Sequence, residues 1–495
     1  GLVTASNQID LLRRPGVATE LENFEVSIEG GYRRISGFTK YGEGSATQPT
    51  GSADRINGVI PYADGVLVVA GNALYFSNDG ISWLQVNKIS ATGGDNYTTF
   101  TGKTESVRTG QEQATFAIFE SAGMDYGEIF IADNSDKDIF SFRMEGTGAL
   151  NTRTFYGKEV QPNGANTPVK YITSHDHHLI VAGLEGEETT IYYSVYNNPN
   201  NFTGAGAGSI SISDTIVGIR GFRTDLIVFC ENSLHKLINI NDTTNIRVDP
   251  IAENVGCLSG YSIQEIGGDV IYLAPDGIRL LSATDRIGDF ALDIASDRIF
   301  KDANTFLAST SSFTSLVLRE KNQYRIFAYI SSEQDDAAKG LIATKFVAQG
   351  AEGLQWATTK GIKANVADSR YSGTTEMVAF GHDDGYIYQL ESGSDFDGES
   401  IEAIYESPYM PLTDPQTRKT FYKLTLYAEP TGTMNLDLNV RYDNKTSSDT
   451  STIQPATQTI SSTGTAIFLF GASNSVFNAA TFGGELDSVY SEQIV

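Results

Sequence analysis

Several features that would fix a class of protein are scarce or missing in this chain of 495 residues. Only two cysteines are present, Cys230 and Cys257, which excludes a disulfide framework; two buried thiols are favoured, and a single bridge stays open. No apolar run approaches the ~20 residues that a transmembrane helix needs, and no signal-peptide pattern occurs. Acidic residues outnumber basic ones 61 to 35, so the surface is not expected to hold nucleic acid through phosphate contacts.

The residues that are abundant favour strands joined by tight turns. Glycine (49), tyrosine (24) and phenylalanine (26) are frequent, whereas runs of helix-favouring residues are rare. The net charge of −26 suits a soluble surface, or a surface that nucleic acid must pass without sticking, and charge alone does not choose between these. The length allows one large all-β domain plus a smaller one, or three modest domains.

One pattern recurs along the chain: a polar turn, an apolar run rich in β-formers, a short turn and an aromatic-rich run. Such hairpins are spaced by about 45–60 residues, the size of a four-stranded propeller blade. Seven of them begin at Ala63, Gly127, His177, Thr224, Gly267, Asn322 and Glu376. Because each hairpin buries one face against its neighbours, we expect the set to close into a ring with few free edges. We therefore predict an all-β fold with a β-propeller over residues 51–403, seven-bladed, with six or eight blades left open.

The turn chemistry supports this prediction. Asp79-Gly80, Asp276-Gly277 and Asp384-Gly385 are expected in two-residue hairpin loops, where φ is positive. The stretch YFSNDGISW also resembles, one residue short, the Asp-box hairpin of sialidases and other propellers, with Ser77, Asp79, Gly80 and Trp83 at the matching positions. We interpret it as a structural turn whose tryptophan packs between blades.

Three other segments differ from the repeat. Residues 1–50 contain two arginine pairs and are predicted to be an N-terminal arm that packs on something other than its own propeller. Residues 404–495 alternate polar and apolar positions and are predicted to be a smaller β-sandwich-like or meander domain, with the ending VYSEQIV leaving open whether the natural chain extends past Val495. A short amphipathic helix is expected from Asp289, within DFALDIASDRIFKDANTFL.

A search for chemistry gives no catalytic residue. His175 and His177 of SHDHHLI would share one face of a strand, but no third ligand is evident, so an exposed strand entry is favoured over a metal site. SDFDGES, residues 394–400, lacks the full calcium-loop pattern and is expected to be an ordinary turn. No Gly-x-Ser-x-Gly elbow occurs, and a glycosidase carboxylate pair has no diagnostic value among 61 acidic residues. We expect no metal, no cofactor and no enzymatic activity.

Four stretches resemble a known family. PGVATELENFEVSIEGGYRRISGF (15–38) is similar to the opening of many bacteriophage tail proteins, IYYSVYNNPNNF (191–202) to their recurring blade strand, and VIYLAPDGIRLLSA with FGHDDGYIYQL to later blades. The family is the short-tailed phage nozzle, or tail tubular protein B. The resemblance implies a structural virion protein, made in the bacterial cytoplasm, that forms a hexameric ring. It also implies portal, adaptor and tail-fibre proteins as partners, and double-stranded DNA that passes without specific binding.

A second hypothesis remains open beside the first: a glycan-binding or glycan-cleaving propeller of a phage fibre or secreted protein. It draws on the Asp-box-like turn and the many aromatic residues. Under the nozzle hypothesis, Arg13, Arg14, Arg33 and Arg34 are the predicted assembly interface, because bidentate guanidinium groups suit carboxylates on an acidic neighbour.

Overall fold

A computed structural model describes residues 20–26, 31–86, 98–99, 112–121, 123–135, 139–148, 153–164, 167–242, 245–281, 295–296, 299, 303, 306–310, 312–348, 351–407, 424–428, 434–440, 457–462 and 490–494. The chain divides into two compact units: residues 18–406, and residues 1–17 together with 407–495. Within the described residues, no helix is long and apolar enough to cross a membrane.

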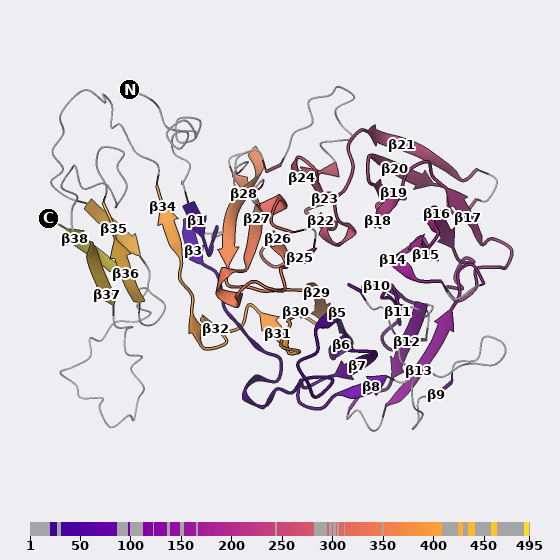
Figure 1. Ribbon diagram of the computed structural model, residues 1–495, viewed down its shortest axis with the longest axis horizontal. Helices are drawn as coiled ribbons and strands as arrows, with labels where there is room; N and C mark the ends of the chain where they lie inside the picture. Colours follow the sequence, from indigo (N-terminus) through magenta and orange to yellow (C-terminus); the bar gives the residue numbers. More distant parts are fainter. Residues whose placement is uncertain are drawn as a thin grey trace. The chain divides into compact units, whose positions relative to one another are not determined.

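The larger unit is a seven-bladed β-propeller (Figure 1), which confirms the predicted fold and blade number. The first blade consists of β5 (Ile56–Tyr62), β6 (Gly65–Ala70), β7 (Ala73–Ser77) and β8 (Leu84–Val86), and the second of β10 (Thr115–Phe119), β11 (Glu128–Ala132), β12 (Ile139–Glu145) and β13 (Thr154–Val160), extended by β9 (Thr98–Thr99). The third blade consists of β14 (Val169–His175), β15 (His178–Leu184), β16 (Glu187–Tyr193) and β17 (Gly208–Ser211). The fourth consists of β18 (Ile216–Phe222), β19 (Asp225–Cys230), β20 (Ser233–Ile238) and β21 (Arg247–Glu253). The fifth blade is β22 (Gln264–Ile266), β23 (Asp269–Ala274) and β24 (Gly277–Leu280), preceded by the 3-10 turn η3 (Gly260–Ser262).

The last two blades contain strands from both ends of the unit. The sixth is β25 (Phe313–Leu318), β26 (Gln323–Ala328), β27 (Lys339–Ala348) and β28 (Ala351–Lys360), extended by β1 (Glu20–Glu22) and β34 (Ile404–Glu406). The seventh is β29 (Val366–Ser372), β30 (Thr375–Gly381) and β31 (Ile387–Leu390), extended by β4 (Phe38–Lys40) and the short pair β32 (Asp395–Phe396) and β33 (Glu399–Ser400).

Each of the seven predicted hairpins is a pair of adjacent strands within one blade. The expectation that a hairpin buries only one face is wrong for the second strand of a blade: β6, β15 and β26 are buried at every position. A propeller blade packs against a neighbour on both faces, so these strands are continuous apolar runs rather than alternating ones. Seven apolar clusters result, one at each interface between successive blades.

The expected packing of the N-terminal arm is also wrong. From Glu20 the chain lies on its own propeller: β4 pairs antiparallel with β31, with Phe38 opposite Leu390. Phe38 is buried in the cluster between the sixth and seventh blades. β1 pairs in parallel with β28 and antiparallel with β34, so the chain enters and leaves the propeller side by side, with Glu20 opposite Glu406. We call residues 20–47 the strap; it also contains the hairpin of β2 (Phe24–Val26) and β3 (Tyr32–Arg34).

The three Asp-Gly pairs lie in turns, but not in the predicted two-residue loops. Gly80, Gly277 and Gly385 do have positive φ, at 71°, 139° and 82°. However, Asp79-Gly80 and Asp384-Gly385 lie in longer connections, and the tight loop before Gly277 is Pro275-Asp276. The two-residue loops of the first blade are Ala63-Asp64 and Gly71-Asn72.

Two smaller predictions are confirmed, and a third cannot be compared with the described residues. Cys230 and Cys257 are free, buried thiols, as favoured, and burial raises the pKa of both to about 12. Residues 395–400 form a tight hairpin, the ordinary turn that was expected. The predicted helix from Asp289 falls mostly outside the described residues.

The smaller unit is described only in part. Two antiparallel pairs are present, β35 (Leu424–Ala428) with β38 (Tyr490–Ile494), and β36 (Met434–Leu438) with β37 (Gln458–Ser462).

Candidate functional site at the closure of the ring

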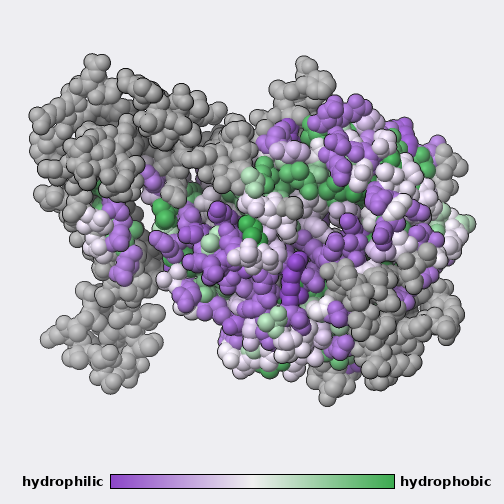
Figure 2. Space-filling view, viewed as in Figure 1, coloured by the Kyte–Doolittle hydropathy of each residue, from purple (hydrophilic) through white to green (hydrophobic). Residues whose placement is uncertain are grey.

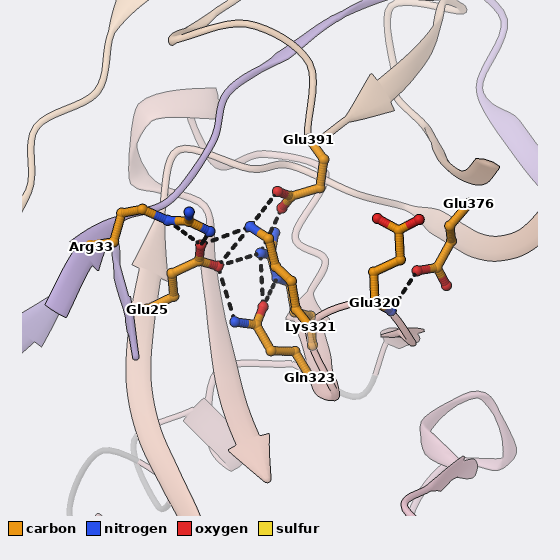
Figure 3. Close-up of polar contacts among 8 residues, drawn as sticks. Glu25, Arg33, Glu320, Lys321, Gln323, Glu376 and Glu391 are labelled. Carbon is orange, nitrogen blue, oxygen red and sulfur yellow. Dashed lines mark hydrogen bonds and ion pairs between the residues drawn. The ribbon is translucent and has the colours of Figure 1, made fainter. Parts of the chain in front are cut away.

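A buried network of polar side chains lies beneath β2 of the strap (Figure 3). We call this network the clasp: Glu25, Lys321, Gln323, Arg325 and Glu391. Glu25 comes from the strap, the next three residues come from the β25–β26 turn and β26 of the sixth blade, and Glu391 directly follows β31 of the seventh. The clasp therefore joins the beginning of the propeller to its last two blades.

In the clasp each carboxylate contacts both cations. Lys321 Nζ lies 2.7 Å from Glu25 Oε1 and 2.5 Å from Glu391 Oε2. Arg325 Nη2 lies 2.7 Å from Glu391 Oε1 and 3.3 Å from Glu25 Oε2. Gln323 Nε2 donates a hydrogen bond of 3.0 Å to Glu25 Oε2. Because each carboxylate is paired with both cations, the network suits a structural role better than a catalytic one.

Burial makes this pairing obligatory. The side chains of Glu25 and Arg325 are 1% and 0% exposed, and an unpaired charge at that depth costs several kcal/mol. Burial raises the pKa of both carboxyls, but Lys321 and Arg325 outweigh it: the pKa of Glu25 is lowered, and that of Glu391 falls to about 2. Both carboxylates are therefore ionised at neutral pH, and the ion pairs of the clasp are formed.

The Asp-box-like turn makes a second contact with the strap. Its polar atoms are used locally: Ser77 Oγ accepts the Gly80 N–H at 2.9 Å, and Asp79 Oδ1 accepts the N–H groups of Ile81 and Ser82 at 2.9 and 2.8 Å. These bonds hold the turn in one shape. Its outer face then binds the strap, where the Thr47 N–H donates to Gly80 O at 3.0 Å.

Trp83 belongs to the same contact. Its indole N–H donates to Thr47 O at 2.9 Å, and its ring is half-buried at the edge of the cluster between the first and seventh blades. The predicted position between blades is therefore correct, although the ring lies at the rim of the cluster and not inside it. The turn with Ser77, Asp79, Gly80 and Trp83 serves ring closure.

The predicted assembly arginines have mixed positions. Arg33 Nη2 lies 2.6 Å from Glu25 Oε1 at the solvent side of the clasp, with 61% of its side chain exposed. Arg34 Nη2 donates to Ser394 O at 2.8 Å. Arg13 and Arg14 lie outside the described residues. The role of these four arginines in assembly stays a prediction, but Arg33 also has a partner within its own chain.

The histidines of SHDHHLI are separated by a turn. His175 ends β14, Asp176 and His177 have positive φ in the turn, and His178 begins β15, so His175 and His177 do not share a strand face. His178 is buried, with its ring nitrogens 2.6 Å from Ser194 O and 2.8 Å from Asn241 Oδ1. In the part of the chain that the structure describes, no three His, Cys, Asp or Glu side chains gather as metal ligands.

A third contact joins the residue after the strap to the turn between β30 and β31, which contains a titratable histidine. His382 opens the turn between β30 and β31; its Nδ1 lies 3.1 Å from Asp384 Oδ1 and its Nε2 lies 3.4 Å from Asp335 Oδ2. The carbonyl of Asp384 accepts a 2.5 Å hydrogen bond from Gln48, which directly follows the strap. Burial opposes the imidazolium, but the hydrogen bond to Asp384 and the nearby carboxylates outweigh it and raise the pKa of His382.

Replacing His382 by asparagine should change how stability depends on pH. Because the pKa of His382 is raised on folding, its charge contributes stability fully below the unfolded pKa of about 6.5, and this contribution is lost as pH rises through the folded value. We expect the wild type to exceed His382→Asn in unfolding free energy at pH 5.5 and to lose that advantage in alkaline buffer, measured by urea titration. His177→Asn, in an exposed turn, is the control. A gap that stays constant across this pH range would disprove the linkage.

The comparisons with known proteins support nothing beyond the fold. No family model and no curated protein matches the chain. Among solved structures, the RRP9 WD40 repeats align with a TM-score of 0.42 and 10% identity over 71% of this chain and 99% of that one. PorZ, a surface component of the type-IX secretion system of Porphyromonas gingivalis, aligns with a TM-score of 0.38 and 11% identity over 77% of this chain and 42% of that one. The AfRom2 CNH domain aligns with a TM-score of 0.34 and 12% identity over 72% of this chain and 97% of that one. Likenesses this distant carry no argument about function.

Proposed function

We propose that this chain is a structural protein of a bacteriophage tail, of the nozzle type, whose copies form a ring around the path of the double-stranded DNA. The observation that carries the proposal is that the segment resembling phage tail proteins also closes the propeller. Residues 15–38 resemble the opening of phage tail proteins, and the described part of this segment, from Glu20, belongs to the strap that closes the propeller.

The way the two ends of the propeller leave it adds support. Glu20 of β1 lies opposite Glu406 of β34, and the second compact unit is made of the residues before and after this pair. The two units are therefore joined by two chain segments rather than one. This arrangement suits a scaffold protein, because the pairing of β1 with β34 holds both ends of the propeller chain together.

The glycan hypothesis receives less support from the same residues. Its main argument was the Asp-box-like turn, and two acceptor atoms, Ser77 Oγ and Asp79 Oδ1, are engaged by the backbone of their own turn. A sugar hydroxyl would have to compete with these bonds. We infer that the turn is architectural and that the chain acts without catalysis.

The proposal predicts self-assembly that depends on the arginine pairs. We expect native mass spectrometry and electron microscopy of the purified chain to show six-fold rings. The double variant Arg13→Glu/Arg14→Glu should give folded monomers, because reversed charges repel an acidic neighbour. This pair is the cleaner test, since reversal at Arg33 would also place a carboxylate beside Glu25.

The control for that experiment is Arg247→Glu, an exposed site on β21 with 64% of its side chain accessible. It should leave the rings intact. A wild-type chain that stays monomeric at tens of micromolar, or that binds glycans as a monomer, would refute the nozzle proposal.

A further inference from the structure

A polar cavity lies on the axis of the propeller, separate from the strap and the clasp. It has a volume of ≈ 310 Å³ and is lined by residues of the inner strands β5, β10, β14, β18, β22, β25 and β29 together with η3. These strands surround the centre of the ring in Figure 1, and the corresponding part of the face in Figure 2 is strongly hydrophilic. The inner strands run alongside one another in register: Thr314 Oγ1, near the start of β25, accepts the Ala367 N–H near the start of β29, and Ser369 Oγ donates to Val317 O further along.

Tyrosines narrow one end of this cavity. The Tyr261 hydroxyl, from η3 of the fifth blade, donates a 2.6 Å hydrogen bond to the carbonyl of Gln113, which precedes β10 of the second blade. These blades are not neighbours, so the side chain spans the axis at the end where the inner strands begin. The ring of Tyr171 lies beside it, with centroids 6.2 Å apart. The Tyr261 side chain therefore crosses the axis at this end of the cavity.

Three arginines line the cavity beyond the tyrosines. Arg220 and Arg370 are each the fifth residue of a seven-residue inner strand, β18 and β29, and Arg319 directly follows β25. Arg319 is neutralised by Glu376, at 3.2 Å. Among the residues that the structure describes, neither Arg220 nor Arg370 forms an ion pair within 4.0 Å. Two guanidinium groups in an acidic protein are thus left available to the cavity.

Among the described residues that line the cavity, Asp368 is the one with a carboxyl group. Asp368 is two residues before Arg370 on β29, so both side chains are on the same face of the strand. Its Oδ1 accepts the Ser369 N–H at 2.8 Å. Burial raises the pKa of Asp368 although the three arginines oppose this, and burial likewise lowers the pKa of Arg220 despite Asp368 and Glu265. Arg220 would gain from an anionic partner in the cavity, whereas a bound oxyanion has to lie away from the Asp368 carboxyl group.

We propose that this axial cavity binds a small ligand through an oxyanion, phosphate or carboxylate, held between Arg220 and Arg370. Guanidinium forks donate paired hydrogen bonds that match the oxygens of either group. The volume falls at the lower end of small-molecule pockets, ~300–1,000 Å³, and cannot admit a DNA duplex. The site is therefore independent of the proposed ring and of any DNA path.

Isothermal titration calorimetry of the full chain with inorganic phosphate, and separately with citrate, tests the site and distinguishes the two oxyanions. We expect saturable binding of at least one anion, weakened by added NaCl. Arg220→Gln and Arg370→Gln should each lower the affinity at least tenfold, in line with the loss of a charge-assisted bond. Neither arginine supports another described side chain through an ion pair, so both variants should keep the wild-type unfolding midpoint.

Arg247→Gln, on the outer strand β21 and away from the cavity, is the matched control and should bind like the wild type. The proposal is overturned if neither anion binds at 10 mM, or if all three variants bind equally. If one cavity variant unfolds, the other still decides the outcome.

Discussion

Replacing Glu25 by glutamine is expected to lower the free energy of unfolding by about 3–5 kcal/mol, since removing one partner of a buried ion network leaves uncompensated charge. Glu25 faces Lys321, Arg325 and Arg33, and Arg325 is fully buried. Glu391 remains in the variant but cannot balance all three cations. Urea denaturation followed by circular dichroism measures the loss, and early proteolysis of the strap should accompany it.

Glu320→Gln is the matched control for this experiment. Glu320 precedes Lys321 in the same turn; its backbone N–H binds Glu376, and no bond of its carboxylate joins the clasp (Figure 3). It should cost well under 1 kcal/mol, as surface changes do. A loss below 1 kcal/mol for Glu25→Gln would mean that the clasp does not stabilise the closure.

The same comparison has a pH arm. The pKa of Glu25 is lowered on folding, so its contribution is present above the unfolded pKa of about 4.3 and is lost as pH falls through the folded value. The gap between the wild type and Glu25→Gln should therefore shrink in acid.

The repeat was predictable from the sequence because its signals are local. GVLVVAGNALYF carries a fully buried strand, a Gly-Asn loop and an aromatic partner strand within a dozen residues, and a hairpin with an apolar strand recurs in each blade. The closure has no such signal. Phe38 pairs with Leu390 at the far end of the propeller, and nothing near Phe38 marks that partner.

The clasp even contradicts the usual pattern. In Phe24-Glu25-Val26 the charged residue is the buried one, while its apolar neighbours are half-buried. Alternation alone would have turned Glu25 toward solvent. Its partners Lys321 and Arg325 lie about 300 residues further along the sequence, in the sixth blade, and they are close to Glu25 because the strap packs on that blade.

The axial arginines were missed for a different reason. Arginine pairs stand out in the sequence, whereas Arg220 in IVGIRGF and Arg370 in VADSRYS are single residues in inner strands. Both are the fifth residue in the first strand of their blades, and this shared position is the sequence feature that could have indicated an axial charge.

Gly80→Ala provides the second large effect. Gly80 has φ 71°, and an added Cβ would lie 2.2 Å from the carbonyl oxygen of Tyr41 and 2.7 Å from the amide nitrogen of Gly42, both backbone atoms of the strap. The positive φ costs roughly 1–2 kcal/mol for a residue with a Cβ. The clash must also move the strap away from the turn, which breaks the hydrogen bonds of Thr47 to Gly80 and Ile81. At about 1 kcal/mol for each bond, the total loss should reach about 3–4 kcal/mol in urea denaturation.

Gly31→Ala separates the two contributions. Gly31 has φ 81° but nothing within 4 Å of its added Cβ, so it carries the backbone strain without the clash and should lose only about 1–2 kcal/mol. Strap release can be observed directly in a Trp356→Phe background, where Trp83 is the remaining tryptophan and loses its bond to Thr47. We expect Gly80→Ala to increase iodide quenching of Trp83 and Gly31→Ala to leave it unchanged. Equal losses for the two alanine variants, with no change in quenching, would show that contact with the Asp-box-like turn does not hold the ring closed.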